Sequence, residues 1–182
     1  QELRLDQRPA LAYERLSLNL GAVTPPSPDQ PPGLVPIKPL EPALAFLADQ
    51  DRQMLNPALA AEPFLVVGSG LAAVETVLAL RQRWPRRPLV LQIRPEQLKP
   101  ALIRALRQAA IQILETDRFE PNDPHEQIPG LLCSGSRAPL WLTDTGLPCC
   151  PSSGRIRTET SLQVIGHPTL FAAGDCAVVD TK

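Results

Sequence analysis

The sequence has few of the residues from which metal sites and disulfide frameworks are built. Its 182 residues include four cysteines and two histidines. The cysteines, at positions 133, 149, 150 and 176, form neither a C-x-x-C pair nor a disulfide framework, and His125 is far from His167 in sequence. No metal site is therefore expected, zinc included. Cys149 and Cys150 could form a redox pair, but a disulfide between neighbours is strained, and small buried thiols are the simpler interpretation.

Long apolar runs and an excess of one charge are also missing. No uninterrupted apolar stretch approaches the roughly 20 residues of a membrane-spanning helix, and residues 1–5 have no signal-peptide character. We therefore expect a cytoplasmic protein without a transmembrane segment. Lys and Arg number 18 and Asp and Glu 19, a formal net charge of −1, so no nucleic-acid partner is expected.

One local group of basic residues surrounds Trp84. It consists of Arg81, Arg83, Arg86 and Arg87. Because the C-terminal end of a helix favours cations, the group is typical of a solvated helix end.

Proline is the residue in excess, with 22 in the chain. Eight of them fall between positions 25 and 42, which predicts a stiff linker. Before it, residues 1–22 have the alternating pattern of strands. After it, residues 39–54 are expected to form a connecting helix, because apolar residues recur at helical spacing at Leu40, Leu44 and Leu47.

A β-α-β unit at residues 63–94 is the centre of the sequence. Residues 64–67 form an apolar run that stops at Gly68, as a strand buried on both faces of a parallel sheet does before a tight turn. A helix follows and ends at the Trp84–Pro85 step, before a second buried strand at residues 89–93. Its expected apolar stripe consists of Leu71, Val74, Leu78 and Leu80.

The turn between this strand and helix has the spacing G-x-G-x-x-A. Gly68 permits the turn, Gly70 lets a pyrophosphate approach the backbone, and Ala73 allows close packing of helix on strand. The free N–H groups of the helix N-terminus would then face the phosphates. The pattern predicts a dinucleotide site. The alternative is that the glycines only make a tight turn.

Further elements continue the α/β pattern. A second amphipathic helix is expected at residues 98–110, followed by a strand at 111–114. Residues 115–130 are interpreted as a short polar loop, and an apolar strand at 131–135 ends in glycine. The face of the second helix that we expect to be buried carries Leu102, Leu106 and Ala109.

The last part of the chain is predicted to hold two short strands. A loop is expected to open at Trp141–Leu142, and residues 156–158 form a candidate strand. Residues 169–173 are expected to be a last buried strand that ends at Gly174. Cys176, which follows, is expected to pack in the interior.

Four motifs, in the same order along the chain, resemble those of a known family. They are LSLNLG at 16–21, GSGLAAVE at 68–75, LCSGS at 132–136 and FAAGDC at 171–176. Together they resemble the flavoproteins with two dinucleotide-binding domains, the pyridine nucleotide-disulfide oxidoreductase family. Residues 12–26 and 138–176 are most similar to its type II NADH dehydrogenase-like branch, and especially to the oxidoreductase domain fused to selenophosphate synthetase.

The resemblance implies an α/β fold, a Rossmann-like parallel sheet with flanking helices, plus partial flavin-domain segments at both ends. In the family the NAD(P)-binding domain interrupts the flavin domain. Residues 1–59 would then be the end of the first flavin-domain segment with its linker and connecting helix, 60–140 the NAD(P)-binding domain, and 141–182 the return segment. The family's first glycine motif would precede Gln1, so the chain resembles a fragment, and the remainder of its own flavin domain is an expected partner.

The resemblance also implies cofactor contacts. The nucleotide set, which would hold the pyrophosphate of NAD(P)H, consists of Gly68, Ser69, Gly70, Leu71, Ala73 and, from the third motif, Gly135. Gly174 and Asp175 would contact FAD. Glu75 would lie near the nicotinamide and the flavin as the catalytic-site residue. An equally simple interpretation makes Glu75 a first-turn carboxylate favoured by the helix dipole.

The end of the second strand bears on the choice between NADH and NADPH. NAD sites usually carry a carboxylate there for the ribose 2′-hydroxyl, whereas this sequence has Gln92-Ile93-Arg94. Arg94 is a candidate for binding a 2′-phosphate. In the alternative, Arg94 points to water while Gln92 or Glu96 contacts the ribose. The branch that the chain resembles uses NADH, which keeps NADH slightly ahead.

The predicted function is that of an FAD-dependent NAD(P)H oxidoreductase, which passes a hydride from NAD(P)H to flavin and electrons on to an acceptor. Disulfide-reductase chemistry is not expected, because the C-x-x-x-x-C pair is absent. The alternative is a non-catalytic nucleotide-binding or scaffold module with a decayed redox site, favoured by the short 115–130 loop. Further expected partners are a fused selenophosphate synthetase domain and, since open sheet edges pair readily, a second copy in a homodimer.

Overall fold

The chain divides into two units, one of which is inserted into the other along the sequence. A computed structural model describes residues 2–4, 6–25, 33–116 and 128–180. The inserted unit is Thr24–Gly135, and the split unit combines Gln1–Val23 with Ser136–Lys182. In this division, described residues 33–54, which include the expected connecting helix, lie in the inserted unit. Among the described residues, no helix is long and apolar enough to cross a membrane.

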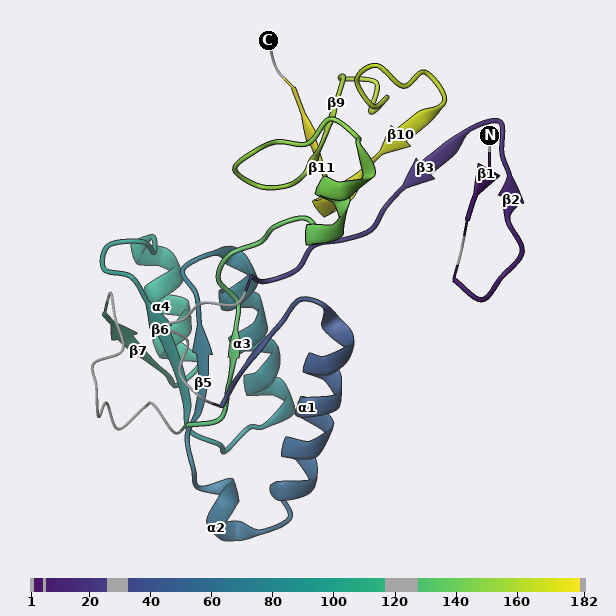
Figure 1. Cartoon of the computed structure of the whole chain (residues 1–182). Coiled ribbons are helices and arrows are strands. Elements are labelled where there is room, and N and C mark those ends of the chain that lie inside the picture. Colours follow the sequence, from purple (N-terminus) through teal and green to yellow (C-terminus); the bar gives the residue numbers. More distant parts are fainter. Residues whose placement is uncertain (1, 5, 26–32, 117–127, 181–182) are drawn as a thin grey trace. The chain divides into compact units, whose positions relative to one another are not determined.

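The inserted unit is built on a sheet of five parallel strands (Figure 1). Its strands are β4 (Leu34–Pro36), β5 (Phe64–Val67), β6 (Leu89–Ile93), β7 (Ile111–Glu115) and β8 (Gly130–Leu132). They lie in the order β4-β8-β5-β6-β7, and each neighbouring pair is parallel. With helices packed beside it, the sheet confirms the predicted α/β, Rossmann-like fold class.

The strand order reverses at β5. From β5 the chain builds β6 and then β7 in one direction, and later returns to place β8 on the other side of β5. In open parallel sheets, the crevice beyond the carboxyl ends of the strands at such a reversal is the usual ligand site. The residues that directly follow β5 and β8 are therefore where a ligand is expected.

Three helices pack on one face of this sheet (Figure 1). They are α1 (Leu40–Gln53), α3 (Leu71–Arg83) and α4 (Pro100–Gln108), and a short helix α2 (Pro57–Ala60) precedes β5. Alternate strand residues point to them, among them Phe64, Val66, Leu89 and Leu91. A second cluster on the other alternate positions contains Leu34, Leu65, Val90 and Leu132. Strands buried on both faces explain the continuous apolar runs of β5 and β6.

The buried faces of α1 and α3 match the prediction in part, since Val74 and Leu80 are buried and Leu47 and Leu78 pack against the core. Leu40 and Leu44 of α1 are exposed, and its core residues are Ala43 with the half-buried Phe46 and Leu47. On α3, Leu71 is exposed, and the buried residues are Ala73, Val74, Val77 and Leu80. Small side chains let these helices approach the sheet closely, as predicted for Ala73, and on α1 Ala43 takes an inward position that was not predicted. The stripe predicted for α4 is confirmed, since Leu106 is buried and Leu102 and Ala109 pack against the core.

The predicted linker contains a strand. Residues 34–36 form β4, which pairs with β8 at the edge of the sheet. Proline is tolerated at such an edge because it has only one neighbouring strand, so the missing N–H breaks no ladder. The predicted connecting helix is confirmed as α1. Residues 26–32 of the linker, and residues 117–127 of the predicted polar loop with His125, lie outside the described residues.

The split unit holds short strands. They are β1 (Glu2–Leu3), β2 (Leu11–Ala12), β3 (Leu16–Leu18), β9 (Ile156–Thr158), β10 (Leu170–Ala172) and β11 (Ala177–Val179). β1 and β2 pair antiparallel, while β3 with β10 and β9 with β11 form parallel pairs. β11 was not predicted.

The interior of the split unit is small. Its cluster contains Ala138, Leu142, Ile156, Val164, Ala172 and Cys176. The loop expected at Trp141–Leu142 is instead a 3₁₀-helix, η1 (Leu140–Thr145), with Leu142 buried and Trp141 exposed. Cys176 is buried as expected. Another 3₁₀-helix, η2 (Gly174–Cys176), follows β10.

The arginines around Trp84 are not simply solvated. Arg87 is buried, stacks on Phe64 and Trp84, and donates from Nε to the carbonyl of Glu62. Burial lowers the pKa of Arg87. Arg81 binds five backbone carbonyls, those of Trp84, Pro85, Arg87, Ala109 and Ala110. Arg81 thus joins the C-terminal ends of α3 and α4.

Replacing Arg81 with methionine should therefore destabilise the inserted unit. The change keeps the aliphatic stem but leaves the carbonyls of Ala109 and Ala110 without their charged donor. We expect a loss of about 2 kcal/mol in the free energy of unfolding, measured by urea denaturation. Arg104→Met is the matched control, because Arg104 is exposed on α4 and makes no hydrogen bond with a described residue. Equal losses in the two variants would contradict this role.

Candidate functional site

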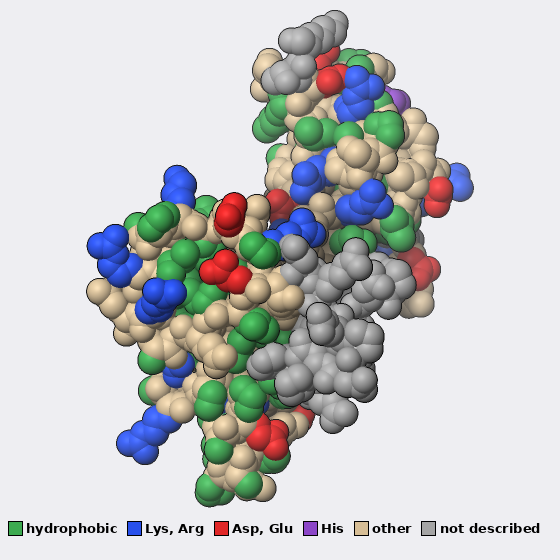
Figure 2. Space-filling view, turned by 90° about the vertical axis from the view of Figure 1, so that its left-hand side faces the viewer, with side chains coloured by type: hydrophobic (Ala, Val, Ile, Leu, Met, Phe, Trp, Pro, Cys, Tyr) green, Lys and Arg blue, Asp and Glu red, His purple; other side chains and the backbone are tan. Residues whose placement is uncertain are grey.

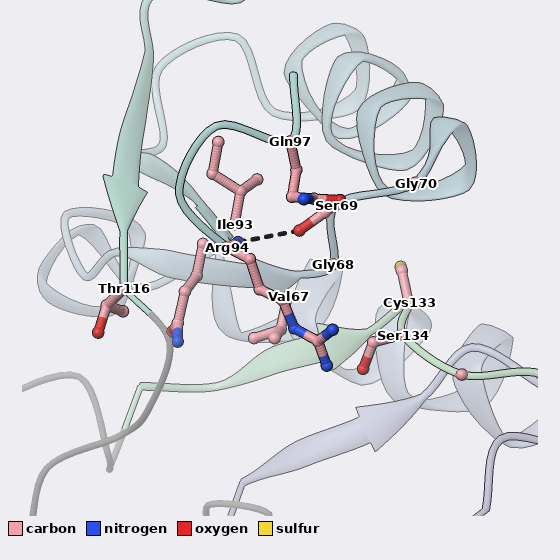
Figure 3. Close-up of a pocket in the computed structure, with 12 residues that line it drawn as sticks. Val67, Gly68, Ser69, Gly70, Ile93, Arg94, Gln97, Thr116, Cys133 and Ser134 are labelled. Atoms are coloured by element: carbon pink, nitrogen blue, oxygen red, sulfur yellow. Dashed lines mark hydrogen bonds between the residues drawn. The ribbon is translucent and has the colours of Figure 1, made fainter.

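A pocket of about 370 Å³ lies at the carboxyl ends of the strands of the inserted unit (Figure 3). Residues that follow β5, β6, β7 and β8 line it. The described lining consists of Val67, Gly68, Ser69, Gly70, Gln92, Ile93, Arg94, Gln97, Thr116, Cys133, Ser134 and Gly135. The pocket therefore occupies the point at which the strand order reverses.

Gly68 brings the start of α3 close to the sheet. Its φ is +150°, and its N–H donates to the carbonyl of Gln92 at 2.9 Å. A Cβ on Gly68 would lie 3.0 Å from the carbonyl carbon and oxygen of Cys133 and 3.1 Å from the Cβ of Ala73. No side chain fits there without moving backbone, which is the physical reason for glycine at 68 and a small residue at 73.

Gly70 is glycine for a different reason. It is the N-cap of α3, with φ −88° and ψ 170°, a conformation open to any residue. A Cβ at this position would meet no atom within 4 Å. Packing therefore does not require glycine. What glycine does is leave the backbone at the start of α3, with its unpaired N–H groups, approachable from the pocket.

The end of β6 forms another wall of the pocket. The backbone N–H of Arg94 donates to Ser69 Oγ at 2.9 Å, which ties β6 to the glycine turn. Figure 3 shows the guanidinium of Arg94 extending across the pocket toward Ser134. Gln92 is only 5% exposed, and its Oε1 has no hydrogen-bond partner among the described residues.

Five residues of the predicted set line this pocket. They are Gly68, Ser69, Gly70, Arg94 and Gly135. Ala73 is buried against Gly68, whereas Leu71 is 67% exposed and is not among the lining residues. The sequence also supplies Thr116, Cys133 and Ser134, which were not predicted. Each comes within two residues of the end of a parallel strand, and that position is the signal that could have found them.

Glu75 lies outside the described lining. It is exposed on the second turn of α3, and the first turn contains no acidic residue. The interpretation of Glu75 as a first-turn carboxylate is therefore wrong, because the helix begins at Leu71 and not earlier. A role of Glu75 near the nicotinamide stays a prediction.

Gly174 and Asp175 belong to the split unit. Gly174 has φ +71°, and a Cβ there would lie 2.7 Å from Oδ1 of Asn19. Both residues follow β10, whose parallel partner β3 ends just before Asn19. The exposed Asp175 is held through its backbone carbonyl, which accepts from Arg155 Nε at 2.9 Å. The residues that follow β3 and β10 thus lie together at the carboxyl end of this parallel strand pair.

The four cysteines are free thiols in different environments. Burial raises the pKa of Cys133 to about 11, although Thr76 lies 3.8 Å from its sulfur. Hydrogen bonding by Ser152 and Ser153 lowers the pKa of Cys150 to about 6. Cys149 and Cys150 are both partly exposed, so the interpretation of this pair as buried thiols is wrong. The turn at residues 150–155 keeps Cys150 near the surface.

Alkylation should distinguish these thiols. Because the thiolate is the nucleophile, Cys150 should react with iodoacetamide near neutral pH, with a rate that rises through about pH 6. Cys133 should stay unmodified there, since its pKa is raised to about 11. Peptide mass spectrometry across the pH range measures both. Ser152→Ala should move the Cys150 profile to higher pH, and faster labelling of Cys133 than of Cys150 would contradict the assignment.

The surface shows no single basic patch on the face drawn in Figure 2. Lys and Arg side chains are dispersed there among hydrophobic and polar ones.

The fold matches solved structures, although no protein-family model and no curated protein matches the sequence. One similar structure is thioredoxin reductase from T. acidophilum, with a TM-score of 0.51 and 12% identity. The match covers 69% of this chain and 48% of that one. The chain thus spans about half the length of that thioredoxin reductase. At this identity the likeness shows the fold alone.

Proposed function

We propose that this chain is the NAD(P)H-binding part of an FAD-dependent NAD(P)H oxidoreductase. The observation that carries the proposal is the glycine turn between β5 and α3, which opens on a pocket at the reversal of strand order. The exposed backbone at Gly70 and the α3 N-terminus suit the negative charge of a pyrophosphate. Arg94 is the only charged side chain among the described lining residues, so no carboxylate there opposes an anion.

The residues of the pocket bind and orient. When bound, NAD(P)H and FAD supply the chemistry, a hydride transfer from nicotinamide to flavin, and electrons then pass to an acceptor. The N–H groups that follow Gly70 hold the phosphates, and the strand ends at Gln92 and Cys133 form the floor. Glu75 is the candidate for orienting the nicotinamide amide, one helical turn beyond the glycine turn. Such positioning is the protein's main contribution to this class of reaction.

The split unit is proposed to supply flavin contacts. Gly174 and Asp175 stand at the carboxyl end of a parallel strand pair, the edge at which cofactors bind in α/β folds. The φ of Gly174 and its approach to Asn19 favour glycine there. A hydroxyl of the ribityl chain or ribose is a suitable donor to the exposed Asp175 carboxylate.

A second candidate function is a nucleotide-binding module without catalysis. It is favoured by the position of Glu75, which is exposed and outside the described pocket. In this case the chain would bind a dinucleotide, but the protein that contains it would not reduce flavin with NADH or NADPH. Anaerobic mixing of the flavin-loaded protein with each dinucleotide, followed at the flavin absorbance, separates the two functions.

Gly70→Ala should weaken nucleotide binding while leaving the fold intact. The added methyl enters open space at the start of α3, where the pyrophosphate would lie, so we expect at least about a tenfold loss of affinity by calorimetric titration. The cost in stability should be at most about 1 kcal/mol, since alanine is only a poorer N-cap than glycine.

Gly68→Ala is the comparison variant. Here the methyl would collide with the backbone of Cys133, so both stability and binding should fall. Unchanged affinity in Gly70→Ala, with binding shown by the unmodified chain, would place the nucleotide elsewhere.

A further inference from the structure

The carboxyl end of β6 is the place at which the pocket would meet the adenosine ribose. β6 is the second strand of the β-α-β unit, and in dinucleotide sites the residue after this strand contacts the ribose next to the adenine. An acidic residue there bonds the 2′-hydroxyl, and a nearby arginine accommodates a 2′-phosphate. The identity and placement of residues 92–96 therefore decide which dinucleotide fits.

No carboxylate is available at this corner among the described residues. Ile93 is buried, with its side chain in the core, and offers no polar group. Glu96 is exposed, has a φ of +59°, and is not among the described lining residues. Among these residues, a ribose 2′-hydroxyl would thus lack the carboxylate acceptor that usually selects NADH.

Arg94, in contrast, is placed for an anion. Its guanidinium forms no hydrogen bond or ion pair with a described residue and extends across the pocket (Figure 3). Its backbone is fixed from two sides, by the hydrogen bond to Ser69 Oγ and by Pro95, which restricts the preceding residue to extended geometry. A guanidinium without an internal partner can give a 2′-phosphate two parallel hydrogen bonds.

Beside Arg94, the pocket holds an unmet hydrogen-bonding group. Gln92 is 95% buried, lines the pocket, and its Oε1 lacks a partner among the described residues. A rotation of the amide exchanges its oxygen and nitrogen, so the group can bond a hydroxyl as donor or acceptor. A ribose hydroxyl common to NADH and NADPH would satisfy this need. The amide of Gln92 and the guanidinium of Arg94 therefore both favour a polar ligand at the end of β6.

We propose that the pocket selects NADPH over NADH, with Arg94 contacting the 2′-phosphate and Ser69 acting as the positioning residue that holds Arg94. The inference rests on the proposed nucleotide site. Ser69, the residue between the two glycines of the G-x-G turn, would then have a second role, because its Oγ accepts a hydrogen bond from the backbone N–H of Arg94 and so links the phosphate-binding turn to the ribose corner. The pyrophosphate and the adenosine ribose would thus bind to two loops that this hydrogen bond connects.

Calorimetric titration of the full chain with NADPH and NADH tests the proposal. We expect NADPH to bind about tenfold more tightly, as one exposed charge-assisted contact would give. Adenosine 2′,5′-bisphosphate and 5′-AMP, which carry only the adenosine end, should show the same ratio. Because Arg94 is exposed, the preference should shrink as salt is added.

Variants separate the roles of the two residues. Arg94→Ala should lower NADPH affinity to that of NADH and leave NADH affinity unchanged. Ser69→Ala should lower the preference in part, and Ser69→Thr, which keeps a hydroxyl acceptor, should retain it. Arg104→Ala is the control, since this exposed arginine of α4 lies outside the pocket lining and should alter neither affinity. Circular dichroism checks that each variant is folded.

The outcomes are distinct. Equal affinities, tighter NADH binding, or an Arg94→Ala variant that loses both dinucleotides equally would overturn the selection of NADPH and leave the nucleotide site standing. An unchanged ratio in Ser69→Ala would overturn the positioning role alone. If neither dinucleotide nor adenosine 2′,5′-bisphosphate binds at millimolar concentration, the proposed function and this inference fall together.

Discussion

The structure depends on the close approach of α3 to the ends of β5 and β8. Gly68 has no room for a Cβ, because the backbone of Cys133 and the methyl of Ala73 occupy the surrounding space. This contact requires the neighbouring order of β8 and β5, and it sets the direction in which α3 leaves the sheet. Once it is made, the start of α3 must face the crevice between the two strand ends. The pocket is thus a consequence of how tightly the turn packs.

Other parts of the inserted unit keep this approach in place. Ser69 ties the turn to the end of β6, and Arg81 holds the far ends of α3 and α4 through their backbone carbonyls. The site itself includes a feature that disfavours the empty state, since the buried Oε1 of Gln92 lacks a hydrogen-bond partner among the described residues. Unmet polar groups of this kind cost stability and are expected at binding sites more than in cores.

The local pattern of the sequence was enough for the centre of the fold and for part of the site. β5, β6 and the start of α3 follow from apolar runs that end at glycine or proline, and the glycine turn and Arg94 lie where short-range rules place them. The inward faces of α1 and α3 were predicted only in part: Leu47, Val74 and Leu80 face the core, but Leu40, Leu44 and Leu71 are exposed. Ala43 is buried instead, because a helix that approaches a sheet closely can turn a small residue inward. Strand β4 was not predicted, because its segment is rich in proline, which an edge strand tolerates. Thr116, Cys133 and Ser134 join the site only through the order of the strands, which is a long-range property.

The central claim is that a dinucleotide binds in this pocket, against the glycine turn. Hydrogen–deuterium exchange of the full chain, with and without saturating NADPH, tests it at the level of the backbone. The account predicts slower exchange of amides at residues 68–73, 92–97 and 133–135, with α4 unchanged as an internal reference. Protection that appears elsewhere and spares residues 68–73 would contradict it.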